Sequence, residues 1–284
     1  MPARPSRRLL LTAALTLPAT ALAGCGVRLE DDAPDIPFVP RREPIPGESA
    51  LLAVLGALES SGVEHSAQRA DLLHAALTDA QVPDTVLADA ASPTSPAEVA
   101  AAFEASVREC GPGLLRLVGQ LTATQRILSP IGDKAALWTD PGTGTWAAGA
   151  VAAAALDATR ATMYALEVVA GQQSTGAVAK AALTASRELR RLSIRQTTAA
   201  GDAVQPLALG YDRPDDVTGT EGRDWVIGSF IRLQAAYAAC FGQLDTDRDA
   251  ALEVTQWMGT AAEISRAQFR QDVPTLYGDG KHQP

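Results

Sequence analysis

The chain has 284 residues, of which 24 are Lys or Arg and 33 are Asp or Glu, so its formal net charge is −9. This acidic balance opposes nucleic-acid binding, which depends on Lys and Arg to neutralise phosphates, and we expect no nucleic-acid partner. Aromatic residues make up only 5% of the chain, whereas alanine is abundant and long segments favour helix. The composition therefore favours an Ala-rich helical protein that gains its stability from many closely packed helices.

The N-terminus has the pattern of an export signal. Three arginines precede an uncharged run over residues 9–21, and the run ends in Leu22-Ala23-Gly24-Cys25. A basic start, a short apolar stretch and small residues at its end are typical of a signal peptide. The run is shorter than the roughly 20 residues of a membrane-spanning helix. The final tetrapeptide resembles the lipobox of bacterial lipoproteins, which implies cleavage of residues 1–24 and diacylglyceryl attachment to the sulfur of Cys25.

Lipidation would place the protein on the extracytoplasmic face of the cell membrane. A single acyl chain such as palmitate holds a protein only marginally, whereas two chains anchor it stably without a spanning helix. The alternative is an ordinary secreted protein in which Cys25 is coincidental. Ser6-Arg7-Arg8-Leu9-Leu10-Leu11 also resembles a twin-arginine export signal, and the choice between that route and the general secretory route stays open.

Residues 25–48 are expected to form a tether. Five prolines lie among charged residues between Gly26 and Glu48, a density that prevents a continuous helix or a central strand. At about 3.1 Å per residue an extended spacer of this length would reach up to roughly 70 Å; the alternative is a disordered connection. Removing residues 1–24 takes away three arginines and no acids and leaves a net charge of −12. Electrostatic adhesion to anionic lipid is therefore not expected.

The rest of the chain predicts an all-α fold. Apolar residues recur every three or four positions, as in Val226, Phe230, Leu233 and Tyr237, and no stretch alternates as a half-buried strand does. Capping-box spacing occurs at Ser61–Glu64 and Thr218–Glu221, and Ser95 precedes a proline at a first helical position. We expect helices near 49–60, 64–81, 96–109, 113–138, 146–171, 173–199, 219–243 and 247–272.

These helices suggest two regions and a tail. The last four, over residues 145–272, predict a four-helix bundle with a tight hairpin at Gly171 and a longer connection from Gly201 to Gly222. Residues 49–140 are expected to form a second helical bundle or a helical cap. The link 139–144 is the candidate boundary, and residues 273–284 are expected to be a tail.

The bundle region resembles a ferritin-like domain. The resemblance is to the ferritin-like domain family of uncharacterised exported actinobacterial (lipo)proteins. It is carried by Met163-Tyr164-Ala165, Ser186-Arg187-Glu188-Leu189-Arg190-Arg191, Pro206-Leu207-Ala208-Leu209-Gly210-Tyr211-Asp212-Arg213-Pro214 and Ala235-Ala236-Tyr237, with Glu64-His65-Ser66-Ala67-Gln68 and Val82-Pro83 in the front half. It implies the ferritin arrangement of a hairpin, a long crossover and a second hairpin.

The di-iron ligands of such bundles are missing from the sequence. That site takes a Glu from each of two helices and a Glu-x-x-His from each of the other two. Here Thr159 lies on the inward seam, Glu188 is followed three residues later by Arg191, and neither Glu253 nor Glu263 has a histidine nearby. The resemblance therefore implies the scaffold without the oxidase, with no cofactor and no enzymatic activity.

Two segments contain side chains that could bind a metal ion. Asp71 and His74 share one helix face at a spacing of three, near Glu64 and His65, but no second histidine-bearing helix supplies further ligands. We expect a solvated helix face or a packed histidine there. The aspartates of segment 245–249 have the spacing of a calcium loop, but Ala250 stands where that loop needs glycine and Gln256 where it needs glutamate. They are expected to cap the last helix instead.

Cysteines and aromatic residues leave further alternatives open. Cys110 and Cys240 could form a disulfide in an oxidising compartment, but both lie on apolar faces, and two buried free thiols are favoured. Seven aromatic residues could either line a ligand pocket near the crossover or fill the core. They are Trp138, Trp146, Trp225, Trp257, Tyr211, Tyr237 and Phe230. Gly142-Thr143-Gly144 is interpreted as a turn, and no serine is framed as a nucleophile.

The sequence thus predicts a membrane-anchored extracytoplasmic lipoprotein that acts as a non-catalytic helical scaffold or binds a partner in the cell envelope. The alternative is a lipoprotein that binds a small ligand or a metal in the bundle interior. A ferritin-like oxidase ranks last because the histidines are missing.

Overall fold

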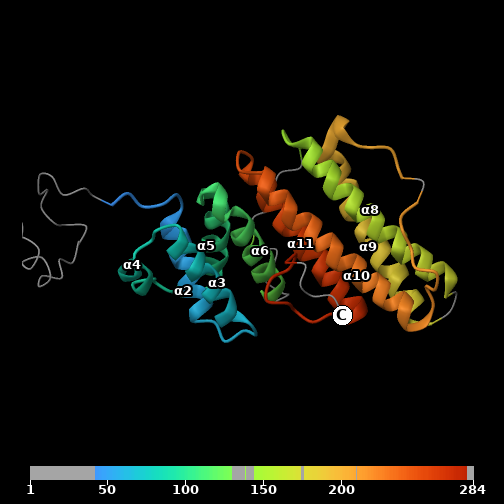
Figure 1. Ribbon diagram of the computed structural model, residues 1–284, viewed down its shortest axis with the longest axis horizontal. Helices are drawn as coiled ribbons and strands as arrows, with labels where there is room; N and C mark the ends of the chain where they lie inside the picture. The colour runs from blue at the N-terminus through green and yellow to red at the C-terminus, as the bar shows by residue number, and fades with distance from the viewer. Residues whose placement is uncertain (1–41, 130–137, 139–143, 174–175, 209, 280–284) are drawn as a thin grey trace, which may run out of the picture. The chain divides into compact units, whose positions relative to one another are not determined.

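The computed structural model describes residues 42–129, 138, 144–173, 176–208 and 210–279, and all regular structure in these ranges is helical. The all-α prediction is confirmed for this part of the chain. The predicted signal peptide, Cys25 and most of the predicted tether and of the link 139–144 lie outside the described residues. The α-helices are α2 Glu48–Glu59, α3 Ser66–Asp79, α4 Asp84–Ala88, α5 Pro96–Glu109, α6 Pro112–Leu128, α8 Gly149–Gln172, α9 Ala177–Ala200, α10 Gly219–Cys240 and α11 Arg248–Phe269 (Figure 1).

Capping explains where some helices begin. Helix α5 starts as predicted: the Ser95 hydroxyl accepts a hydrogen bond from the Glu98 amide, and the Glu98 carboxylate accepts one from the Thr94 amide. The other two capping boxes were wrong. Helix α3 begins only at Ser66, after a left-handed residue. Helix α10 begins at Gly219 as predicted, with Thr218 as its N-cap residue, but the Thr218 hydroxyl donates to Asp216 and makes no capping bond.

One helix and two helix ends differ from expectation. The short helix α4 was not predicted, α6 ends at Leu128, and α8 continues through Gly171 to Gln172. A glycine inside a helix costs only about 1 kcal/mol relative to alanine, which tertiary packing offsets. The turn between α8 and α9 instead uses Gly176, whose φ of 131° suits glycine.

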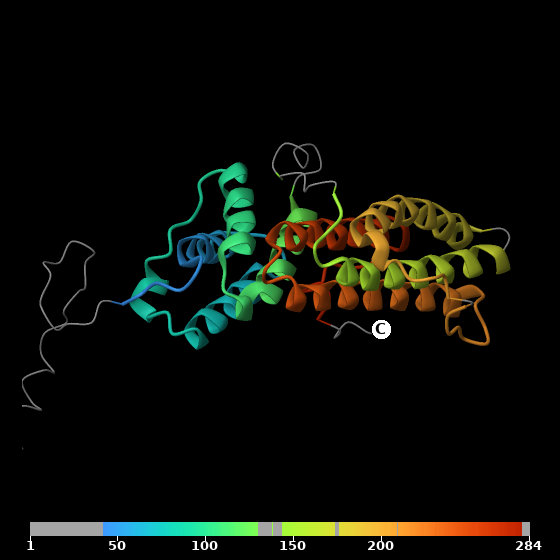
Figure 2. The same ribbon diagram turned by 90° about the horizontal axis from the view of Figure 1, so that it is seen from above.

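The last four long helices form a four-helix bundle. Helix α8 lies beside α9 and α10, and α11 lies beside α10 and α9 (Figure 2). The crossover from α9 to α10 runs along α8: Arg160 donates to the Gln205 carbonyl at 3.0 Å, and Gln173 donates to the Val217 carbonyl at 3.2 Å. Helix α10 therefore begins near the end of α8 and runs antiparallel to it.

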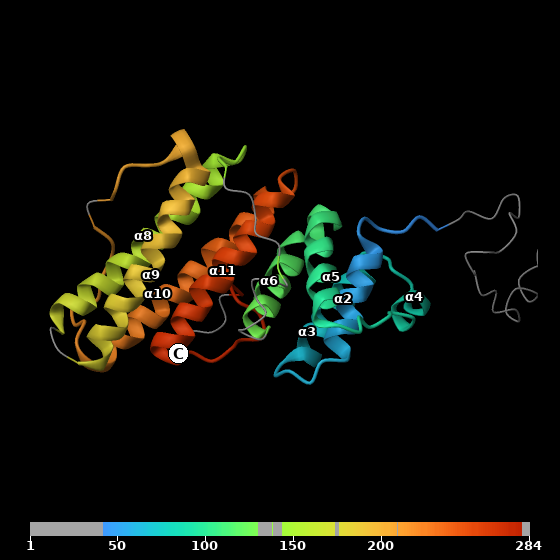
Figure 3. The ribbon, with the colours of Figure 1, turned by 180° about the vertical axis from the view of Figure 1, so that it is seen from behind.

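Helices α2 to α6 pack against this bundle. Helix α6 contacts α5 and α3 on one side and α11 on the other (Figures 1 and 3). Seven consecutive residues of α6, Val118 to Thr124, are buried, and so are six of α11, Ala250 to Thr255. Helices buried all round lie at the centre of a fold. One hydrophobic core thus continues from the N-terminal helices into the bundle.

The segment after α11 is part of this core. The side chain of Arg69 in α3 donates to the Thr275 carbonyl at 2.8 Å, and Gln120 in α6 donates to the Tyr277 carbonyl at 2.8 Å. Leu276 and Tyr277 are buried. Residues 273–279 are therefore docked, and the expectation of a tail from residue 273 was wrong for them.

A glycine in α6 should be required for its packing. A Cβ atom at Gly119 would lie 2.5 Å from the ring of Phe241, which is buried. Overpacking costs typically about 1–3 kcal/mol, so Gly119→Ala should lower the free energy of unfolding by about 1–2 kcal/mol in a denaturant titration.

The matched control is Gly113→Ala in the first turn of the same helix, where a Cβ would meet no atom within 4 Å. This variant should be neutral or slightly stabilising. Equal stability of the two variants would contradict the packing assigned to Gly119.

Candidate functional site

The bundle contains a buried carboxylate, that of Glu253 in α11. This residue is 2% exposed. Its position follows from the helical period, because Ala250, three residues earlier, and Trp257, four residues later, are buried on the same helix. An ionised carboxylate in such a place must be paired with a cation and hydrogen-bonded.

Four N–H groups satisfy this carboxylate. The guanidinium of Arg195 in α9 makes a two-pronged contact, with Nε 2.6 Å from Oε1 and Nη2 2.6 Å from Oε2 of Glu253. The indole of Trp146 donates to Oε2 at 2.8 Å, and that of Trp257 donates to Oε1 at 3.2 Å. Paired, planar contacts of this kind are the strongest ion pairs in proteins. We call Glu253, Arg195, Trp146 and Trp257 the buried ion-pair cluster.

The two tryptophans of the cluster stack on each other. Their ring centroids are 4.6 Å apart and their planes differ by 7°. The backbone amide of Trp146 also donates to the Ala199 carbonyl at 2.9 Å, and Arg195 donates to the Gly144 carbonyl at 2.9 Å. The cluster therefore joins three parts of the chain: α11, α9 and the segment that leads into α8.

A chain of hydroxyl groups lies next to the cluster. The Gln196 side-chain amide donates to the Tyr237 hydroxyl at 2.9 Å, so the tyrosine proton is directed to Thr159, 2.7 Å away, whose own hydroxyl donates to the Ala155 carbonyl. Burial raises the pKa of Tyr237 above its ordinary value. The hydroxyl therefore acts as a neutral link between α8, α9 and α10.

This arrangement provides little for a metal ion. Both oxygens of Glu253 already accept N–H bonds, and the inward hydroxyls of Thr159 and Tyr237 are paired with each other. Within the described ranges, no group of three or more His, Cys, Asp or Glu side chains could hold a metal. The cluster therefore serves to fix the positions of the helices that it joins.

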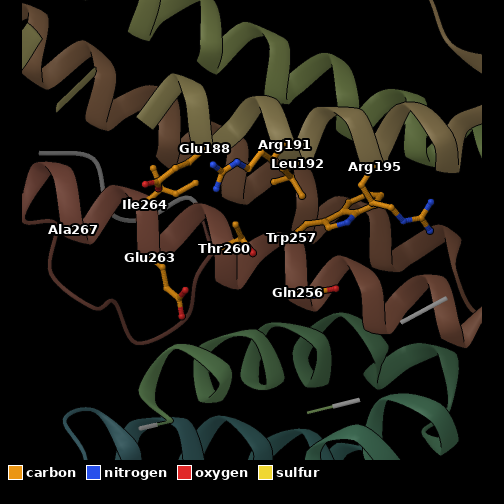
Figure 4. A pocket seen from close by; sticks show the side chains of 10 residues that line it. All are labelled: Glu188, Arg191, Leu192, Arg195, Gln256, Trp257, Thr260, Glu263, Ile264 and Ala267. Atoms are coloured by element: carbon orange, nitrogen blue, oxygen red, sulfur yellow. The ribbon is translucent and has the colours of Figure 1, made fainter. Parts of the chain in front are cut away.

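A groove opens beside the cluster, between α9 and α11 (Figure 4). It has a volume of about 440 Å³. Trp257 and Leu192 contribute apolar surface, and Glu188, Arg191 and Glu263 contribute charges of both signs. Glu188 and Arg191, which occupy the Glu-x-x-His spacing, thus lie in this groove between the two helices.

The residues weighed as metal ligands lie elsewhere. Asp71 and His74 are both exposed on α3. Asp247 caps α11, as predicted, by accepting a hydrogen bond from the Ala250 amide at 3.1 Å. Asp249 pairs with Arg108 of α5.

The two cysteines are buried free thiols. Arg248, the first residue of α11, donates to the Cys110 carbonyl, and the Cys240 thiol donates to the Ala236 carbonyl of its own helix. The disulfide considered for Cys110 and Cys240 is not formed in this structure. Burial raises the pKa of both thiols, to about 12 for Cys240.

The aromatic residues divide between the core and the crossover. Trp146, Trp257, Tyr237 and Phe230 are core residues, and Trp138 is buried beside the guanidinium of Arg126, 4.8 Å from its ring centroid. Trp225 and Tyr211 instead line a separate cavity beneath the crossover.

Sequence reasoning missed the buried ion-pair cluster. In the sequence, Glu253 stands out only as a carboxylate without a nearby histidine, and no local pattern singles out Arg195. The signal was present in α11, where Glu253 lies on the buried period four residues before Trp257. Its partners lie 58 and 107 residues away, and no local pattern connects them.

The comparisons with known proteins add no relative: no family model, no curated protein and no solved structure matches this chain.

The ion pair should contribute strongly to stability. Glu253→Gln leaves the Arg195 guanidinium without its counter-ion in a largely buried place, which costs about 3–5 kcal/mol when one partner of a buried pair is removed. We expect a loss of about 3 kcal/mol in the free energy of unfolding, measured by denaturant titration.

The control is Glu167→Gln, which breaks the more exposed pair of Glu167 with Arg190, where the side chains are 48% and 63% exposed. Exposed pairs contribute less than about 1 kcal/mol. If both substitutions had equally small effects, Glu253 would not be a structural centre.

The thiols should be unreactive in the folded protein. The thiolate is the reactive form, and burial raises the pKa of Cys110 and Cys240 above the ordinary value. At pH 8 we expect Cys110 and Cys240 not to react with a thiol-specific chromogenic reagent within an hour.

After unfolding without a reductant, both thiols should react. The double variant Cys110→Ala/Cys240→Ala corrects for any contribution from Cys25. Absence of these two thiols until a reductant is added would show that the disulfide exists.

Proposed function

We propose that this protein is a lipid-anchored extracytoplasmic protein whose folded part is a non-catalytic, ferritin-like helical bundle that acts as a scaffold or binds a partner in the cell envelope. The observation that carries the proposal is the buried ion-pair cluster. Glu253, the buried carboxylate of the bundle among the described residues, already accepts hydrogen bonds from Arg195, Trp146 and Trp257 and so is not free to begin a metal centre.

The helix order supports the ferritin-like part of the proposal. The chain makes a hairpin of α8 and α9, a crossover along α8, and a second hairpin of α10 and α11. The crossover returns the chain over the length of the bundle, so α10 runs antiparallel to α8. Ferritin-like folds have one such long connection.

The anchor rests on the sequence of residues 1–25. In the part of the chain that the structure describes, no helix has both the length and the apolar character needed to span a bilayer. Two acyl chains on Cys25 would give stable attachment without one. The Pro-rich tether would hold the bundle away from the lipid surface.

Partner binding is supported by the outer face of α9. Leu183 and Ile194 are 43% and 64% exposed, and Arg187 is exposed between them. Residues at spacings of four and seven share a helix face. This face therefore combines apolar and cationic side chains on an otherwise acidic protein, a composition suited to contact with another macromolecule.

Anchoring can be tested by replacing the acylated cysteine. In its own host, the unsubstituted protein should be recovered in the membrane fraction with an acylated N-terminal cysteine, seen by mass spectrometry. Cys25→Ser should abolish acylation and shift the protein out of this fraction, whereas Cys110→Ser, at a buried thiol, should not. Membrane retention of Cys25→Ser would contradict the anchor.

Metal content tests the absence of catalysis. Protein purified from its host should contain no stoichiometric metal and should not oxidise added ferrous iron. Stoichiometric iron with turnover that His74→Ala abolishes would overturn the non-catalytic reading in favour of an oxidase.

A further inference from the structure

A second cavity lies beneath the crossover, between it and helices α8 and α10. Its volume is about 640 Å³, within the range of roughly 300–1,000 Å³ of small-molecule sites. The buried ion-pair cluster does not contribute to its lining. The crossover supplies Tyr211 to Pro214, α8 supplies residues from Ala158 to Ala165, and α10 supplies residues from Trp225 to Ala236.

The floor of the cavity is apolar. Four alanines line it, at positions 158, 161 and 165 of α8 and 236 of α10. The Thr162 hydroxyl donates to the carbonyls of Ala158 and Ser229, and the Ser229 hydroxyl donates to the Val226 carbonyl. Because both hydroxyls are satisfied by backbone groups, the floor offers mainly methyl groups to a ligand.

The walls are aromatic. Tyr211 and Trp225 line the cavity, and Tyr164 contacts both rings, with centroids 5.6 Å and 6.5 Å away. The Tyr211 hydroxyl donates to Asp157 at 3.0 Å. Burial and this bond raise the pKa of Tyr211 to about 12, so the ring is neutral and held in place. Such rings favour a flat apolar body that can stack on them.

The charge of the lining is positive. Arg213 from the crossover and Arg232 from α10 are both exposed at the cavity, and neither has a hydrogen-bond or ion-pair partner among the residues that the structure describes. Asp212 is the one acidic residue in the lining. Guanidinium groups bind carboxylates with two parallel N–H bonds.

We propose that this crossover cavity binds a planar organic anion, of the class of aromatic carboxylates, whose ring packs on the alanine floor beside Tyr211 and Trp225 and whose carboxylate is bound by Arg213 and Arg232. The proposal goes beyond the scaffold role and does not depend on the lipid anchor.

Three probes with the same ring system test it: 2-naphthoate, the neutral 2-naphthalenemethanol and the cationic 2-naphthylmethylammonium. Binding is measured by isothermal titration calorimetry on the full chain carrying Cys25→Ser, which cannot be acylated. We expect saturable one-site binding of 2-naphthoate with a Kd below about 1 mM. The neutral probe should bind at least about fivefold more weakly and the cationic probe more weakly still.

Variants assign the binding to this cavity. Arg213→Gln/Arg232→Gln should weaken 2-naphthoate binding by about tenfold and remove its advantage over the neutral probe, because the carboxylate loses both guanidinium groups. Both arginines are exposed, so we expect the double variant to fold. Trp225→Ala should weaken all three probes. Arg116→Gln, at an exposed arginine of α6 outside the lining, is the control and should leave each Kd within twofold.

Three outcomes would overturn the proposal. They are no saturable binding of 2-naphthoate, equal affinity for the three probes, or an effect of Arg116→Gln as large as that of the double variant. Far-ultraviolet circular dichroism and thermal melting of each variant separate loss of binding from loss of folding.

Discussion

The structure depends on one buried ion pair. Glu253 and Arg195 face each other between α11 and α9, and two tryptophan N–H groups complete the bonding of the carboxylate. Buried charges carry a large desolvation cost, which is offset only when every lone pair and proton is matched. A shift of α9 along α11 by one turn would break this match, whereas an Ala-rich apolar interface would tolerate it. We infer that the pair fixes the register of the two helices and the position at which α8 begins.

Other buried polar groups of the bundle are also hydrogen-bonded to one another. A series of uncharged hydrogen-bonding groups connects α9 through α10 to α8; its members are Gln196, Tyr237, Thr159 and the Ala155 carbonyl. Two side-chain oxygens of this interior, Oε1 of Gln196 and Oε1 of Gln234, are buried without a hydrogen-bond partner. Among the described residues, however, no group of three or more His, Cys, Asp or Glu side chains could hold a metal ion. In the scaffold that we propose, specificity is therefore expected on the outside: in the α9–α11 groove, on the outer face of α9 and beneath the crossover.

Local patterns predicted the helices well and the site poorly. The seam Val226, Phe230, Leu233 and Tyr237 is buried as its period indicated, and α5 matches its predicted bounds because Ser95, Pro96 and Glu98 define its start. The Ser61 capping box failed because a left-handed His65 follows it and delays α3. Glu253 could be assigned to a buried face, but its partners come from other helices and loops. Only the packing of α9 against α11 reveals that this carboxylate is neutralised by an arginine.

The burial of α6 on all sides bears on how the molecule loses its structure. From Val118 to Thr124 this helix contributes side chains to both the N-terminal group and the bundle, with α11 as its main neighbour in the latter. Neither group can separate without exposing to water a helix segment that is buried on every side in the folded protein. The apparent boundary in the sequence near residue 140 therefore does not separate two independently stable domains. The two halves should unfold in a single cooperative step, and neither should fold when it is transferred without the other.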